Sequence, residues 1–141
     1  MESLDADKLP DGALVLVDSA PIIYTLESHG KFAKRFARLF QRHADGEIEL
    51  AVTTITIAEV LTGPLGADEE ALAKRYRAVL EAWRVVDFTS DIAEGAARVR
   101  GRYGMKLPDA IQVASALAVN ADALVTHDRD FAKVRGLRVL G

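Results

Sequence analysis

Four carboxylates stand where they could hold a divalent cation. Asp18 and Asp128 each follow a short apolar run of residues. Glu59 lies inside a mostly apolar segment, and Asp109 follows a proline. Oxygen-only ligands of this kind suit Mg²⁺ or Mn²⁺. Because such a cation activates water and screens the charge of a scissile phosphate, the expected chemistry is metal-assisted phosphodiester hydrolysis.

Each of these acids also has a plainer explanation. Asp18 and Asp128 stand where a carboxylate commonly caps a helix. Asp109 falls in a first helical turn, where the helix dipole stabilises an acid. Glu59 fits a solvent-facing position of its helix as well as it fits a buried site. The pattern alone therefore does not show that the four acids converge.

The elements that must position these acids alternate between strands and helices. Strands are expected at residues 13–17, 50–53, 85–88, 123–126 and 137–140. Helices are expected at residues 22–27, 32–45, 55–62, 68–83, 90–104 and 109–120, with a short one at 129–134. This alternation predicts an α/β domain with a parallel sheet covered on both faces. Since ligands bind beyond the carboxyl ends of such strands, Asp18 and Asp128 would lie at the same edge.

Composition and length bound the class of protein. The chain has 141 residues, half of them hydrophobic and 28% charged, which is typical of one globular domain. It contains no cysteine, so disulfides and thiolate metal sites are excluded. We expect residues 1–12 to be a loose tail and residues 13–141 to form the single domain.

Neither a targeting signal nor a membrane span is expected. Residues 1–12 are acidic and polar, whereas a secretory signal begins basic and then turns apolar. The apolar run at residues 13–17 is far shorter than the roughly 20 residues of a membrane span. The sequence therefore predicts a cytoplasmic protein that is not bound to a membrane.

The charge distribution gives two opposing indications about nucleic acid. The net charge of −3 argues mildly against a partner held through its phosphates alone. Two local stretches are nevertheless basic, Lys31–Arg42 and Arg98–Lys106. These stretches are candidates for phosphate contacts, and solvated helix faces are the plainer explanation.

Four segments around the acids resemble the acidic motifs of PIN domains. They are Leu16–Ala20, Ile57–Leu61, Leu107–Ala114 and Leu124–Phe131. The segments occur in the family's order and with similar spacing, and the resemblance runs from Ala13 to the last residue. The compact length is similar to that of VapC toxins, the ribonuclease half of VapBC toxin–antitoxin pairs.

The resemblance implies a three-layer α/β/α fold with a central parallel sheet of about five strands. It also implies a ribonuclease that depends on Mg²⁺ or Mn²⁺, with a catalytic metal site lined by Asp18, Glu59, Asp109 and Asp128. Asp130 is an auxiliary ligand in this interpretation, or else a cap of the short helix that follows. Ser19 and Thr126 would form hydrogen bonds around the ligands.

The resemblance also implies partners. These are an RNA substrate, a VapB-like antitoxin and a second copy of the chain in a homodimer. Four apolar residues of one predicted helix give weak support to the dimer: Tyr76, Val79, Leu80 and Trp83. His127 departs from the family pattern, in which a small polar residue is common, and we expect it to be an exposed bystander.

Two other functional assignments are alternatives to a PIN-domain ribonuclease. Haloacid-dehalogenase phosphatases need a second acid two residues after the first, where this chain has Ala20. The acidic pair and lysine of receiver domains and the glycine patterns of nucleotide-binding loops are absent as well. The remaining alternative is a non-catalytic PIN-like module that binds RNA or a partner, which loss of one acid would have favoured.

Overall fold

The centre of the molecule is a five-stranded parallel sheet with the strand order β3-β2-β1-β4-β5. All 141 residues are described in the computed structural model. The strands are β1 (Leu14–Val17), β2 (Glu49–Thr53), β3 (Arg84–Val86), β4 (Ala123–Val125) and β5 (Val139–Leu140). From β1 the chain adds strands first on one side and later on the other. The strand order therefore reverses between β1 and β4, and sheets of this kind bind ligands beyond the carboxyl ends of the strands at such a point.

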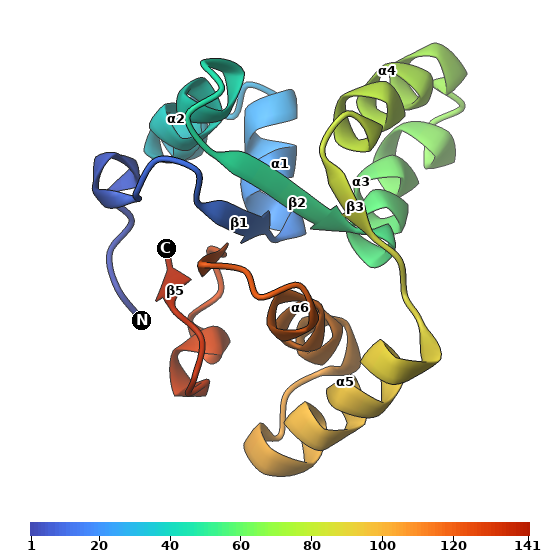
Figure 1. The fold of residues 1–141 in the computed structure, drawn as a ribbon. Helices are drawn as coiled ribbons and strands as arrows, with labels where there is room; N and C mark the ends of the chain where they lie inside the picture. The colour runs from blue at the N-terminus through green and yellow to red at the C-terminus, as the bar shows by residue number, and fades with distance from the viewer.

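Helices cover both faces of the sheet, which gives the predicted three layers (Figure 1). One face carries α1 (Ser19–Leu26), α2 (Gly30–Ala44), α3 (Thr54–Gly66) and α4 (Glu70–Glu81). The other face carries α5 (Ser90–Tyr103) and α6 (Leu107–Ala118). Two short 3-10 helices, η1 (Ala6–Lys8) and η2 (Arg129–Lys133), complete the fold. No helix has the length and the apolar character needed to cross a bilayer.

Alternation along β1 divides the core between the two faces. Leu14 and Leu16 pack in the cluster beneath α5 and α6. Val15 and Val17 pack with α1 to α4 on the opposite face. Since both faces are covered, the strand is a continuous run of branched apolar residues rather than an alternating one.

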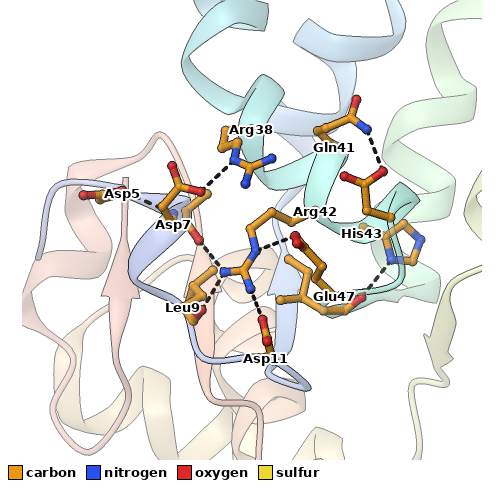
Figure 2. A network of polar contacts seen from close by, with 12 residues as sticks. Asp5, Asp7, Leu9, Asp11, Arg38, Gln41, Arg42, His43 and Glu47 are labelled. Atoms are coloured by element: carbon orange, nitrogen blue, oxygen red, sulfur yellow. Dashed lines mark hydrogen bonds and ion pairs between the residues drawn. The ribbon is translucent and has the colours of Figure 1, made fainter.

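The first twelve residues form an ordered segment, contrary to the loose tail that the sequence suggested. Glu2 forms a parallel β-bridge with Leu140 of β5, and the side chains of Ala6 and Leu9 are buried. Arg42 of α2 donates from Nη1 to the carbonyls of Ala6 and Leu9, at 2.8 and 2.5 Å (Figure 2). Local periodicity gives no sign of this packing because the segment is held by contacts to distant residues.

The expected end of one helix is wrong, and one residue considered for a dimer contact is buried. The helix α3 does not stop at Gly63 but continues to Gly66, with Pro64 buried inside its last turn. A proline there removes a single hydrogen bond near the end of the helix, which the helix tolerates. Of the residues considered for a dimer contact, Leu80 of α4 is fully buried in the core, Trp83 is partly buried against Phe40, and Val79 is 42% exposed.

Candidate metal centre

Asp18 is the anchor of the site at the carboxyl end of β1. Its carboxylate caps α1 by accepting from the backbone N–H of Ser19 at 2.9 Å. It also accepts from Gln112 Nε2 at 2.9 Å and from Thr126 Oγ1 at 2.8 Å. The residue is only 8% exposed, and none of the seven ion pairs of the chain includes it. Asp18 is therefore a buried acid that is held by neutral donors and has no cationic partner.

Gln112 connects Asp18 to the second strand. Its amide nitrogen also donates to Thr56 Oγ1 at 2.6 Å, and its amide oxygen accepts from Thr53 Oγ1 at 2.8 Å. All four of these residues are buried, and no buried side-chain polar atom of the chain lacks a partner. A fully satisfied network of this kind fixes the orientation of the carboxylate.

Sequence reasoning gave Gln112 no role. It lies three residues after Asp109 on the otherwise small and apolar helix α6, so the two residues share one helical face. A single amide on a buried apolar helix must find hydrogen-bond partners, and this was the signal that could have identified it.

Asp109 stands in the first turn of α6, and its pKa is raised to about 6. Partial burial is the main cause, followed by the negative charges of Asp18 and Asp128; Lys106 opposes them. Because a carboxylate raises the pKa of another only when it is near, these acids occupy a common region.

Glu59 belongs to the same group of charges. Its pKa is raised by partial desolvation first and then by the charges of Asp18 and Asp109, while the Ser19 side chain opposes the shift. The residue faces solvent on α3, which is less buried than its apolar sequence suggested, because only Thr56, Val60 and Pro64 are buried there. Glu59 therefore lies at the solvent-exposed edge of the acidic group.

Asp128 and Asp130 stand where β4 leads into η2. The Asp128 carboxylate caps η2 by accepting from the backbone N–H of Asp130 at 2.9 Å, and both residues are exposed. The backbone N–H of Asp128 donates to Thr126 Oγ1 at 3.1 Å, so one hydroxyl joins the two strand ends. Asp130 also raises the pKa of Asp109 and thus lies within reach of the acidic group.

The acidic side chains do not form a complete metal-coordination site by themselves. No three acidic or histidine side chains lie close enough together to hold a metal ion by themselves. Mg²⁺ sites commonly use only one or two carboxylates and complete the shell with water and substrate phosphates. The donor set of one fixed buried acid and several nearby acids that are half-buried or exposed fits such a cation.

His127 is not the exposed bystander that was expected. It is half-buried, and its Nδ1 lies 3.2 Å from the Tyr24 hydroxyl. Its ring also packs against Phe32, with the ring centroids 5.0 Å apart. The local reason is that α1 and α2 bring two aromatic rings to the residue that precedes Asp128.

The comparison with known families decides the assignment of the fold. The sequence profile of the PIN domain matches residues 15–137, nearly the whole chain. The chain belongs to the PIN domain family. A search among curated protein sequences finds no match.

Several solved structures similar to this PIN domain come from toxin–antitoxin systems. A chain of a toxin–antitoxin complex from Klebsiella pneumoniae is 30% identical, with a TM-score of 0.68 over 87% of this chain and 94% of that one. VapBC2 from Rickettsia felis, bound to a promoter DNA fragment, is 17% identical, with a TM-score of 0.72 over 89% and 96%. VapC20 from Mycobacterium tuberculosis, a toxin that cleaves the sarcin–ricin loop, is 16% identical, with a TM-score of 0.65 over 84% and 92%. The predicted VapC-like PIN fold is thereby confirmed.

Proposed function

We propose that this PIN domain is a metal-dependent ribonuclease and the toxin of a VapBC-type pair. The observation that carries the proposal is Asp18, a buried carboxylate with three neutral donors, no cationic partner and other acids around it. Burial of an uncompensated charge is costly, so such an arrangement is best explained by a cation that binds there. The membership in a family of toxin nucleases supports the same function.

In this proposal Asp18 and Asp109 hold the cation, with Glu59 and Asp128 completing the acidic site and Asp130 as an auxiliary ligand. When bound, Mg²⁺ or Mn²⁺ would activate water and neutralise the charge that builds up on the scissile phosphate. Gln112 and Thr126 keep both oxygens of Asp18 in a fixed direction, which lowers the cost of organising the site. Ser19 orients the carboxylate of Asp18 through its backbone N–H.

The partners follow from the same relatives. The similarity to chains of toxin–antitoxin and VapBC complexes supports a VapB-like antitoxin for this chain. We also propose a homodimer; of the four residues first considered for it, Leu80 is buried in the core, Val79 is 42% exposed, and Tyr76 and Trp83 are partly exposed. Co-expression with the product of a small neighbouring reading frame, followed by size-exclusion chromatography with light scattering, tests both partners.

The test of the activity is cleavage of a single-stranded RNA by purified protein with and without Mn²⁺. Asp18→Asn keeps the size of the side chain but removes the charge that a hard cation needs. The several kcal/mol that such a cation supplies correspond to a loss of about a thousandfold or more in the rate. Asp11→Asn is the matched control because Asp11 lies at the opposite end of β1, and it should cleave like the parent.

Equal cleavage by the parent and Asp18→Asn in saturating Mn²⁺ would contradict the proposal. The non-catalytic RNA- or partner-binding module would then be the better description. In a bacterial host, expression of the parent should arrest growth while expression of Asp18→Asn should not.

A further inference from the structure

A basic pocket borders the acidic site. It has a volume of about 480 Å³, within the range of ligand-binding pockets, and we call it the basic pocket. Its charged and aromatic lining residues are Lys31, Phe32, Arg35, His127 and Arg129, and no acidic residue lines it. His127 and Arg129 are the direct neighbours of Asp128 in the sequence, so the basic pocket adjoins the proposed metal centre.

Two cations of the basic pocket, Lys31 and Arg129, are free of carboxylate partners, whereas the third, Arg35, is already bound to Gly141. None of the seven ion pairs of the chain involves Lys31, Arg35 or Arg129. Arg35 donates from Nη2 to the main-chain oxygen of Gly141, which also lines the pocket. By contrast, Arg38, one turn further along α2, is paired with Asp7 at 2.7 Å. In a chain with a net charge of −3, two unpaired cations that line one pocket favour an anionic ligand.

The aromatic wall of the basic pocket is held in place. The ring of His127 meets Tyr24 edge-on, with the centroids 5.5 Å apart, and Phe36 in the same way at 6.0 Å. Phe32 stacks on Tyr24 at 4.9 Å. His127 and Phe32 are only half-buried, so each still offers ring surface to the pocket. Proteins stack single-stranded bases on rings of this kind.

We propose that the basic pocket is a nucleotide subsite for single-stranded RNA. The phosphate next to the scissile one would contact Lys31 and Arg129, and its base would stack on Phe32 and His127. The inference rests on the proposed function. It explains how a polyanion approaches an acidic centre, because the neighbouring cations offset the repulsion of the carboxylates.

Binding of a fluorescein-labelled single-stranded oligoribonucleotide, followed by anisotropy in EDTA, tests the subsite without cleavage. The test variant is Lys31→Gln/Arg129→Gln. The control is Lys74→Gln/Arg75→Gln, which removes one lysine and one arginine from exposed, unpaired positions of α4. The test variant should bind about tenfold or more weakly and reduce the slope of log Kd against log salt by about 0.7, the contribution of one phosphate contact on a single strand. The control should remain within twofold of the parent.

His127→Ala separates stacking from charge. It should weaken RNA binding about tenfold and leave the salt slope unchanged, because a stacking surface is lost and no phosphate contact. Binding by Lys31→Gln/Arg129→Gln that equals binding by the control would overturn the subsite. So would displacement of the RNA by polyglutamate as efficient as by unlabelled RNA, because the pocket would then recognise acidity alone and suit an acidic protein segment.

The outcome is distinguishable from failure of the proposed function. If the parent cleaves RNA with Mn²⁺ and the pocket variant binds and cleaves like the control, the subsite is wrong while the nuclease stands. If the pocket variant loses RNA affinity but the parent never cleaves, the nuclease is wrong and the subsite belongs to a binding module.

Discussion

The two ends of β1 each hold a buried charge, and the two charges are compensated differently. At the amino end, Arg42 is 4% exposed and pairs with Asp11 at 2.6 Å and Glu47 at 3.0 Å (Figure 2). At the carboxyl end, Asp18 is 8% exposed and is met only by neutral donors. The positive charge of Arg42 is balanced by two carboxylates of the protein, whereas no positive charge of the protein balances Asp18.

This difference separates a structural charge from a functional one. Arg42 fastens the N-terminal segment to α2 through the carbonyls of Ala6 and Leu9, and its charge is balanced on the spot. Asp18 has hydrogen bonds that orient it but do not neutralise it. A buried carboxylate in that condition, surrounded by other acids, is suited to a cation that comes from solution.

The largest change in stability is expected from a substitution of Arg42, whose charge is balanced within the protein. Arg42→Met removes four hydrogen bonds to the N-terminal segment and to two carboxylates, and should lower the free energy of unfolding by about 3 kcal/mol. Urea unfolding measures this loss. The rate of RNA cleavage at temperatures well below the melting point should stay within twofold of the parent. A large loss of cleavage in a still-folded Arg42→Met would break the distinction between the two ends.

The next effect is expected at Gln112, which positions Asp18 without being a ligand itself. Gln112→Met keeps the volume but removes the donor to Asp18, and loss of such a supporting hydrogen bond typically costs 10–100-fold. The concentration of Mn²⁺ needed for half-maximal cleavage should rise by about that factor, a change that a purely structural role would not cause. Gln41→Met, which loses only a surface bond to Asp45, is the control. An unchanged Mn²⁺ requirement in Gln112→Met would remove Gln112 from the account.

The smallest effect is a pH dependence of stability without metal. The pKa of Asp109 is about 6 in the folded protein, compared with an ordinary value of 3.8 that applies to the unfolded chain. Between these two pH values the folded state therefore binds more protons than the unfolded state. The contribution of Asp109 to stability is therefore lost as the pH rises through about 6. Asp109→Asn should be more stable than the parent by on the order of 1 kcal/mol at pH 7.5, and equally stable near pH 4.

Urea unfolding at the two pH values measures this difference. Asp87→Asn, at an exposed carboxylate without hydrogen bonds, should show no such gain. A gain for Asp109→Asn that is the same at both pH values would show that charge repulsion is not its source.

The sequence predicted the fold well and the site in part. Apolar runs and helical periodicity located all five strands and six helices, because each element buries one face or both. Strand ends placed Asp18 and Asp128 at the same edge, as parallel sheets require. The N-terminal segment was missed because Arg42 holds it across a sequence separation of more than 30 residues, which no local pattern reveals. Gln112 was missed for a similar reason, since its partners come from β2, α3 and the end of β1.

The most direct test of the proposed metal site at Asp18 is the effect of Mn²⁺ on the melting temperature of three proteins: the parent, Asp18→Asn and Asp11→Asn. Binding at a hundred times Kd stabilises a folded protein by about 2.7 kcal/mol, which raises the melting temperature of a domain of this size by several degrees. The parent and Asp11→Asn should both show this rise in millimolar Mn²⁺, and Asp18→Asn should show none. An equal rise in all three proteins, or no rise in the parent, would contradict the claim that Asp18 is a buried charge that a cation compensates.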